Sequence, residues 1–408
     1  MERIYASSKQ IAMKRLVLIA LAGLLLSCAC NNAIEPVGPS NGGGGGGGNT
    51  PAPVATSDWS ALADSCTNVL VANFLDKSTG TFWSTPNDVA RSSQYIYWQQ
   101  AHALDVLLYA ARRNASLKDD YLAYADKWYA NYANNYNRDH RGEGTYGGFF
   151  NVWTDDMAWI CLTLLNISEL SGDAKYRETS KEVFDRYIWP RRLSYSGGMA
   201  LPWTSRPEDA SNFNACTNAP SCLVAARLHG YYGSAGYLDI AKTLYKACID
   251  HMPDLERVEE PPLSYTQGTF GEACRTLYHL TGDVAYMDKA GVVLQYAFTS
   301  NRCTDSATGV LRHEGTDMDQ SLFKAVLIPY AVNYVLDSKA DTRAAQIIRE
   351  KLLLCAKTLD KHLDRKMYPR MYCDYFWGST FADGVASMGA QASGASLMEG
   401  VARMTATQ

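Results

Sequence analysis

Two adjacent aspartates, Asp155 and Asp156, interrupt an otherwise apolar segment that also contains Trp153, Met157 and Trp159. Aspartate is rarely buried fully unless it is paired, so two acids in a segment expected to pack on most sides need an explanation. Neighbouring carboxyl groups ionise unequally, because the first charge disfavours the second. One group is therefore expected to stay charged while the other keeps its proton longer.

A structural role for the two acids is the alternative. Thr154 could cap a helix, which would put Asp155 and Asp156 in the first turn, where negative charge suits the helix dipole. The flanking residues Trp153 and Trp159 are not needed at a solvated helix start. The two interpretations are compatible, since a helix that starts in an open cleft both caps itself and presents its acids.

A second group of candidate residues, Trp98, Gln99 and His102, falls within about one turn of an expected helix. A tryptophan beside amides suits a sugar, whose ring has an apolar face and a polar rim. The alternative is that Trp98 belongs to the core and His102 is a hydrogen-bonded core histidine.

Three more helix starts carry polar residues. Asn218 could cap a helix or bind a hydroxyl group, and Tyr265 and Gln267 precede Gly268, which indicates a close backbone approach or an unusual backbone dihedral. Lys324 lies on an apolar helix, where a lysine more often extends its amine to solvent than acts on a substrate. These residues are further candidates for substrate binding.

The elements that would position these residues are helices, because the apolar spacing after Asp58 is helical and no clear hairpin signal appears. The sequence predicts an all-α fold of a dozen helices in six pairs. The expected helices cover residues 58–75, 95–113, 117–135, 154–170, 173–189, 217–231, 235–252, 266–280, 283–299, 318–337, 341–359 and 385–405.

Short turns and long loops alternate between these helices. The turns 171–176 and 281–286 are nearly identical in sequence and join antiparallel neighbours. The longer links are rich in Gly, Trp, Tyr, Asp and Pro, and long loops in compact domains tend to be functional. This layout predicts an (α/α)6 barrel, a toroid of six helical hairpins. An open α-solenoid would show a stricter repeat.

Composition excludes several classes of function. The 408 residues carry a net charge of −4, so no electrostatic footprint for nucleic acid is present. The chain has no His-Glu-x-x-His motif, phosphate-binding glycine loop or nucleophile elbow, and its seven histidines are dispersed. We therefore expect neither a metal site nor a cofactor.

The first 57 residues have the composition of a leader and a tether. Lys14 and Arg15 precede an apolar run at 16–26 that is too short for a comfortable membrane span. The following Cys28 fits a lipoprotein cleavage site, so residues 1–28 are predicted to be a signal peptide with Cys28 lipidated. Residues 29–57, with a glycine run at 42–48, are predicted to be a flexible linker, and residues 58–408 the catalytic domain.

The ten cysteines after Cys28 show no metal-ligand spacing. We expect most of them to be small core residues, although an exported protein permits disulfides. Cys216 and Cys222 are the nearest pair in the folded body and are the candidates for one bond.

Several of these motifs together resemble glycoside hydrolase family 76, the endo-acting α-1,6-mannanases, over about residues 58–406. The most specific is Thr154-Asp155-Asp156-Met157-Ala158-Trp159, which looks like the family's consecutive-aspartate motif. The family usually has Asn where Thr266 stands, which puts the substrate role of that position in doubt. The other similar stretches, in the family's order, are 97–102, 216–220, 265–268 and 323–324.

The resemblance implies an (α/α)6 barrel that cleaves α-1,6-mannan with retention of configuration. Asp155 would be the nucleophile and Asp156 the acid/base, and retention requires their carboxyl groups to lie about 5–5.5 Å apart. Mannan polysaccharide or oligosaccharide would be the partner of a monomeric protein. The expected substrate-binding residues are Trp98, Gln99, His102, Trp153, Asn218, Tyr265, Gln267 and Lys324.

Two other functions fit parts of the sequence. A non-catalytic glycan-binding lipoprotein of an uptake system would explain the leader and the 26 tyrosines, but not the adjacent acids. Another (α/α)6 enzyme, such as a lyase, would favour a basic cleft, and the arginines do not cluster on the expected inner helices. The residues after Cys28 lack an acidic run, which favours a periplasm-facing lipoprotein over one on the cell surface.

Overall fold

The computed structural model describes residues 58–89, 97–135 and 149–406, and these residues belong to one compact unit. The predicted signal peptide, the lipidated Cys28 and the linker lie outside the described residues. Among the described residues, no helix is long and apolar enough to cross a membrane.

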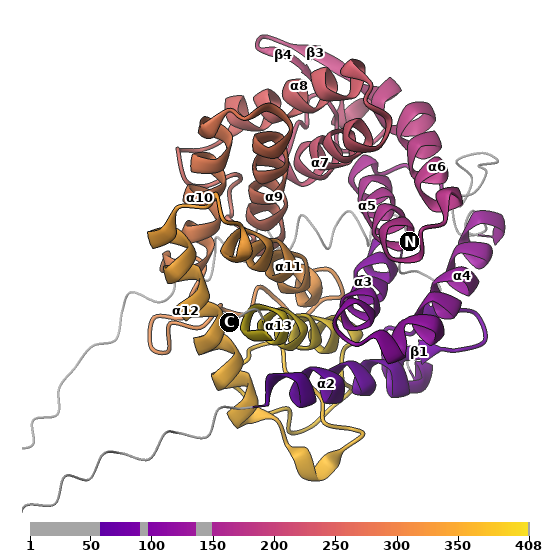
Figure 1. The fold of residues 1–408 in the computed structure, drawn as a ribbon, viewed down its shortest axis with the longest axis vertical. Coiled ribbons are helices and arrows are strands. Elements are labelled where there is room, and N and C mark those ends of the chain that lie inside the picture. The colour runs from indigo at the N-terminus through magenta and orange to yellow at the C-terminus, as the bar shows by residue number, and fades with distance from the viewer. Residues whose placement is uncertain (1–57, 90–96, 136–148, 407–408) are drawn as a thin grey trace, which may run out of the picture. The chain divides into compact units, whose positions relative to one another are not determined.

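The predicted all-α fold is confirmed, and the described residues contain twelve α-helices arranged as an inner and an outer ring (Figure 1). The inner helices are α3 (Trp98–Arg113), α5 (Thr154–Ser171), α7 (Ala215–Tyr232), α9 (Ser264–Thr281), α11 (Phe323–Leu336) and α13 (Met388–Ala406). The outer helices are α2 (Trp59–Phe74), α4 (Lys118–Asn135), α6 (Ala174–Val183), α8 (Ala235–His251), α10 (Val284–Thr299) and α12 (Thr342–His362).

The two rings differ in how their residues are buried. Inner helix α5 is buried on almost every side, from Thr154 to Ser168. Outer helix α12 buries only one stripe, including Ile348, Leu352 and Leu359, at the spacing of an amphipathic helix. Five of the six pairs are hairpins of consecutive helices. The sixth pair joins the two ends of the folded unit, because α13 packs on α2 and closes the ring.

Glycine ends three of the inner helices, as the repeated turn predicted. Gly172, Gly233 and Gly282 have φ values of 78°, 64° and 75°, which residues with a Cβ rarely adopt. Asp173 and Asp283 follow two of them and accept hydrogen bonds from the first turns of α6 and α10. A short turn of this kind forces each outer helix to run back along its inner partner.

Two small antiparallel hairpins were not predicted from the sequence. Their strands have only two or three residues, too few to show an alternating apolar pattern. They are β1 (Leu75–Asp76) with β2 (Thr81–Phe82), and β3 (Leu193–Tyr195) with β4 (Gly198–Ala200).

The helix expected at 173–189 also differs, since α6 ends at Val183 and continues as a π-helical turn, Phe184–Ile188, and a 3-10 turn, Trp189–Arg191. Among the described residues, the other 3-10 turns are Pro86–Asp88, Ala115–Leu117, Pro207–Asp209, Gln320–Leu322 and Arg365–Met367.

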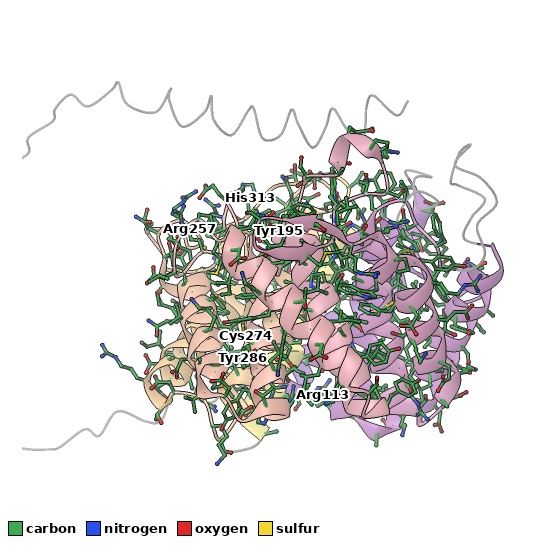
Figure 2. All side chains as sticks on the ribbon, turned by 90° about the horizontal axis from the view of Figure 1, so that it is seen from above. Arg113, Tyr195, Arg257, Cys274, Tyr286 and His313 are labelled. Atoms are coloured by element: carbon green, nitrogen blue, oxygen red, sulfur yellow. The ribbon has the colours of Figure 1, made fainter. Side chains whose placement is uncertain are left out.

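The two ends of the barrel have different chemistry. Long loops meet the N-termini of the inner helices at one end, where Tyr195, Arg257 and His313 lie, and Arg113 lies toward the other end (Figure 2). At that second end Arg113 donates to Glu399 at 2.6 Å. Further ion pairs join the C-terminal halves of neighbouring inner helices, such as Arg227 of α7 to Glu169 of α5. The loop end therefore differs from the opposite end, where such ion pairs link the inner helices.

The core holds nine cysteines, all buried and unbonded. The prediction of small core cysteines is confirmed for these residues, and the candidate bond between Cys216 and Cys222 is wrong. Six positions on one helix span about 600° of rotation, so the two thiols leave α7 in different directions. Cys222 donates to the Ala241 carbonyl, and Cys216 faces Asp155.

Candidate active site

The start of α5 is held by an arginine from the turn after α6. Arg191 donates to the backbone carbonyls of Asn151 and Val152, both at 2.7 Å, and to the Thr154 hydroxyl at 3.1 Å. Thr154 is the first helical residue, and Trp153 occupies the cap position without a side-chain hydrogen bond. The prediction that Thr154 caps the helix is wrong, because its hydroxyl is used by Arg191.

Asp155 is buried, with 5% of its surface exposed, and its carboxylate is surrounded by donors. Its Oδ1 accepts from the Asp156 amide at 3.0 Å. Its Oδ2 accepts from the Trp203 indole N–H at 3.0 Å and from the Cys216 thiol at 3.5 Å. Donors to a carboxylate favour its charged form, and the N-terminus of α5 adds to this effect. The carboxyl group of Asp155 is thus held in one orientation by three hydrogen bonds.

Asp156 has a more open environment. Its side chain is half-buried, and its Oδ2 accepts a hydrogen bond from the Asn151 amide at 3.0 Å. Consecutive side chains on a helix diverge by about 100°, so the two acids leave α5 in different directions. Both carboxyl groups can reach one substrate only if it binds at the barrel mouth, that is, at the loop end where α5 starts.

A third carboxyl group, Glu259, lies near Asp155 and was not predicted from the sequence. It comes from the loop between α8 and α9 and accepts from the backbone N–H groups of Ala215 and Cys216 at the start of α7. Burial, together with the charge of Asp155, raises its pKa to about 7. In the sequence, the length of this loop was the only feature that indicated a functional segment.

Replacement of Glu259 by glutamine should change how stability depends on pH. Because the pKa of Glu259 lies above its usual value of 4.5, the folded protein keeps a proton that the unfolded chain releases. The contribution of protonated Glu259 to the stability of the folded protein is complete below about pH 4.5 and is lost as the pH rises through 7. Between pH 5 and 8, the free energy of unfolding of Glu259→Gln should therefore rise relative to that of wild type by about 1–3 kcal/mol. The Tm of the variant should rise relative to the wild-type Tm over the same range.

The neighbouring Glu260 supplies a control of opposite sign. Its hydrogen bond with Arg302 lowers its pKa, so the wild-type protein should lose this contribution as the pH falls. Glu260→Gln should consequently cost stability at pH 7 and little at pH 3.5. The interpretation fails if thermal melts of the two variants show the same pH trend.

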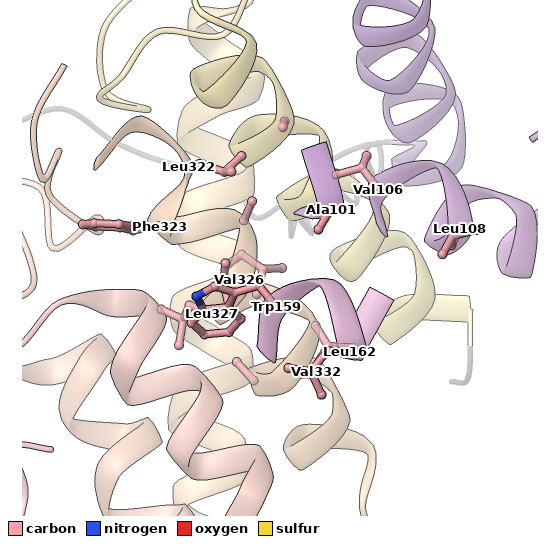
Figure 3. Packing of buried hydrophobic residues seen from close by; sticks show 14 of the residues in the cluster. Ala101, Val106, Leu108, Trp159, Leu162, Leu322, Phe323, Val326, Leu327 and Val332 are labelled. Carbon is pink, nitrogen blue, oxygen red and sulfur yellow. The ribbon is translucent and has the colours of Figure 1, made fainter. Parts of the chain in front are cut away.

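Aromatic rings from four inner helices meet in the centre of the barrel. The Trp98 ring lies 6.3 Å from Trp159 and 6.4 Å from Tyr265, and the Tyr265 ring stacks on Phe323 at 4.1 Å. Figure 3 shows Trp159 and Phe323 among the buried apolar residues of α3, α5 and α11. Burial and the nearby Cys216, Glu259 and Asp155 raise the pKa of Tyr265. The structure therefore brings Trp98 and Tyr265 together with the aspartate pair.

His102 lies one turn below Trp98 and is a core residue. Its ring packs edge-on against Trp98 and Trp159, at 5.4 and 5.1 Å, and its Nδ1 lies 3.5 Å from an Asp105 carboxylate oxygen. With 4% of its surface exposed, it packs against two rings of the aromatic floor, which is the cluster of Trp98, Trp159, Tyr265 and Phe323. Its Nε2 is buried without a hydrogen-bond partner among the described residues, and substrate contact by His102 stays a prediction.

Two predicted substrate-binding amides, Asn218 and Gln267, instead hold loops. The amide of Asn218 pairs with both the N–H and the carbonyl of Leu201, at 2.9 and 3.0 Å. Gln267 accepts from the Val258 N–H at 2.6 Å and donates to the Glu256 carbonyl at 3.0 Å. At 1% and 0% exposure, both amides have used their donors on backbone groups. Their contact with substrate stays a prediction.

The same arrangement recurs on two other inner helices. Gln100 of α3 pairs with the N–H and carbonyl of Phe82, and Gln391 of α13 joins the Cys373 N–H to the Cys66 carbonyl. Buried backbone groups must find partners, and an amide provides a donor and an acceptor at once. One amide near the start of each of these helices thus fixes a segment of the mouth.

Removal of one such amide should destabilise the fold. Asn218→Ala leaves the N–H and carbonyl of Leu201 buried without their partner, so we expect a loss of about 2–4 kcal/mol in the free energy of unfolding. Urea unfolding followed by circular dichroism measures it. Gln346→Ala, which removes an amide on the exposed face of α12 that bonds Glu350, should cost less than about 0.5 kcal/mol.

Lys324 is also a structural residue in this protein. Its amine donates to the Tyr375 carbonyl at 2.7 Å and lies 4.3 Å from the centre of the Trp377 ring. Burial lowers its pKa to about 8. The residue is 2% exposed, and its contact with substrate stays a prediction.

Trp153 and Gln99 both lie at the loop end. The Trp153 ring is half-buried and has the Arg206 guanidinium 5.1 Å away. Gln99 accepts from the Tyr97 N–H and donates to Asp319. Trp203, which binds Asp155, comes from the loop before α7 and carried no signal in the sequence beyond the aromatic content of that loop.

No group of three or more His, Cys, Asp or Glu side chains in residues 58–89, 97–135 and 149–406 is placed to hold a metal ion. The groups that meet around the start of α5 include carboxyls, aromatic rings and hydrogen-bond donors. Such a set can bind a neutral ring and transfer protons at one of its bonds.

Comparison with known proteins gives a family and a fold. The family model described as "Glycosyl hydrolase family 76" matches residues 58–407. A search of curated protein sequences found no match.

Solved structures of similar fold include an inactive variant of the α-1,6-mannanase GH76A of Salegentibacter sp. HEL1_6, bound to an α-1,6-linked mannose tetrasaccharide. It carries two consecutive Asp→Ala substitutions. It is 23% identical, with a TM-score of 0.73 over 85% of this chain and 100% of that chain. The family 76 mannosidase Bt3792 of Bacteroides thetaiotaomicron is 16% identical, with a TM-score of 0.63 over 85% and 98%. Dfg5 of Chaetomium thermophilum, in complex with glucosamine, is 14% identical, with a TM-score of 0.62 over 85% and 91%.

Proposed function

Because the chain belongs to glycosyl hydrolase family 76, we propose that it is an endo-acting α-1,6-mannanase that hydrolyses its substrate with retention of configuration. Membership of the family makes the protein a glycoside hydrolase that degrades mannan. The linkage, the endo action and the stereochemistry are the proposed part. The observation that carries them is the pair of consecutive acids, Asp155 and Asp156, at the start of an inner helix facing the loop end of the barrel.

The environments of the two acids support their division of roles. Asp155 is buried among donors that favour its charge, as a nucleophile attacking the anomeric carbon requires. Asp156 is more exposed, where it can give a proton to the leaving oxygen and later take one from water. In the first step the bond from the anomeric carbon to the leaving oxygen breaks while Asp155 forms an ester with that carbon. Water, deprotonated by Asp156, then hydrolyses the ester.

Product analysis tests the substrate and the endo action. Incubation with unbranched α-1,6-mannan should release a ladder of oligosaccharides early in the reaction, which chromatography of the products resolves. Accumulation of mannose alone would show exo action. Binding without any release would favour a glycan-binding protein over an enzyme.

The stereochemistry requires a separate measurement. Proton NMR of the first anomer released from an oligosaccharide should show the α configuration, because two inversions at the anomeric carbon give net retention. A β-configured first product would contradict the assignment of Asp155 as nucleophile.

We further propose that the protein is an exported lipoprotein, lipidated at Cys28, that acts as a monomer at the periplasmic side of a membrane. The apolar run at 16–26 and the cysteine that follows support this. Labelling with a radioactive fatty acid should mark the wild-type protein and not Cys28→Ser. Equal labelling of both would rule out this anchor. Protease treatment of intact cells tests the orientation.

A further inference from the structure

Asp319 is a carboxylate at the loop end of the barrel with one oxygen held and one open. It precedes the turn Gln320–Leu322 that leads into α11. Its Oδ1 accepts two hydrogen bonds from the start of α3, from the Trp98 indole N–H at 2.9 Å and from the Gln99 amide at 2.5 Å. No donor to its Oδ2 is found among the described residues, and the side chain is only half-buried.

The partners of Asp319 differ from those of the structural acids in this protein. At the other end of the barrel Glu399 pairs with Arg113 and Glu272 pairs with Arg275, as structural carboxylates of low exposure usually do. In the part of the chain that the structure describes, Asp319 has no basic partner within ion-pair distance. Among the described residues, its carboxyl group is therefore held at the loop end by neutral donors alone.

The two donors are themselves rigid. Trp98 is 5% exposed, and its ring lies 6.1 Å from Phe323 in a stacked arrangement. The Gln99 side-chain oxygen accepts from the Tyr97 N–H at 2.9 Å, which fixes the amide so that its nitrogen faces Asp319. A carboxylate oriented in this way loses little freedom when it accepts one more hydrogen bond.

Asp155, at the start of α5, is held in a similar way. There too an indole N–H, that of Trp203, binds one carboxylate oxygen. Through Trp98, whose ring lies 6.3 Å from Trp159 one turn below the aspartate pair, Asp319 is connected to the same aromatic floor. A sugar ring lying over this floor would present its hydroxyl groups at its rim, where such a carboxylate binds them.

We propose that Asp319 determines substrate binding in this protein by accepting, at Oδ2, a hydrogen bond from a hydroxyl group of a mannosyl unit in the barrel mouth. The inference rests on the proposed function and adds a binding residue to it. Trp98 and Gln99 are then positioning residues, which act on the sugar through Asp319.

Binding measured without turnover tests this role. The background is the double variant Asp155→Asn/Asp156→Asn, titrated with an α-1,6-linked mannose tetrasaccharide in a calorimeter. Asp319→Asn keeps an oxygen for Trp98 and Gln99 and removes only the charge and the acceptor at the open position. Asp319→Ala removes both. Asp305→Asn, which changes a half-buried acid of the same loop that is held only by its own turn, is the matched control.

We expect Asp319→Asn and Asp319→Ala each to raise the Kd at least about tenfold, and Asp305→Asn to leave it unchanged. The Tm of Asp319→Asn should stay within about 1 °C of the background, which separates lost binding from lost folding. An unchanged Kd in Asp319→Asn would overturn this inference alone. A background that does not bind the tetrasaccharide would overturn the proposed function and this inference with it.

Discussion

The Asp155→Ala variant should lose hydrolysis of unbranched α-1,6-mannan by at least about 10⁴-fold in kcat, because it removes the carboxylate proposed to form the glycosyl ester. Azide gives the result a stereochemical signature. In the space left by the carboxylate, azide can attack an activated aryl α-mannooligosaccharide directly, so the expected product is the β-configured mannosyl azide. NMR of the azide product distinguishes this outcome from general damage to the site.

Folding must be monitored in this variant because Trp203 and Cys216 lose their acceptor. Circular dichroism and the Tm should remain close to those of wild type. Asp239→Ala, at an exposed position of α8, is the control and should keep full activity. Full activity of Asp155→Ala, or an α-configured azide product, would show that Asp155 is not the nucleophile.

The Asp156→Ala variant should fail for a different reason and show the opposite azide product. Without an acid, the natural leaving sugar is not protonated, and mannan hydrolysis should again fall by at least about 10⁴-fold. A substrate with a dinitrophenol leaving group needs no proton, so the ester on Asp155 should still form and accumulate. Azide then attacks this ester and yields the α-configured mannosyl azide.

The dependence on the leaving group is the decisive measurement for Asp156. The ratio of activity on the dinitrophenyl substrate to that on mannan should rise by several orders of magnitude relative to wild type. Equal losses on both substrates would contradict the assignment as acid/base. The pH profile should also lose its alkaline limb, since that limb reports the acid in the free enzyme.

The elements were predictable because local patterns specify them. The inner helices are apolar on nearly all sides and the outer helices on one stripe, and Gly172 and Gly282 end their helices through local backbone conformation. These signals lie within a few residues of one another in the chain. The two short hairpins and the π-helical turn at Phe184–Ile188 were missed because two to five residues carry no readable period.

The hydrogen-bond partners of the polar residues at the loop end could not be predicted from the sequence. Asn218 and Gln267 have the sequence signature of sugar-binding residues, a polar side chain at the start of an inner helix. An amide has the same donors and acceptor whether its partner is a hydroxyl group or a backbone group. Only the path of the loops shows that Leu201 and Val258 supply the partners.

The sequence by itself therefore determined the helices, the barrel and the choice of Asp155 and Asp156 as candidate catalytic residues. Helical period, glycine turns and consecutive acids are all local properties of the chain. The tertiary structure alone decided which groups surround that pair. Trp203 lies 48 residues from Asp155 along the chain, and Asp319 lies 221 residues from Trp98. No local pattern encodes such distances, since they depend on how six helix pairs close into one ring.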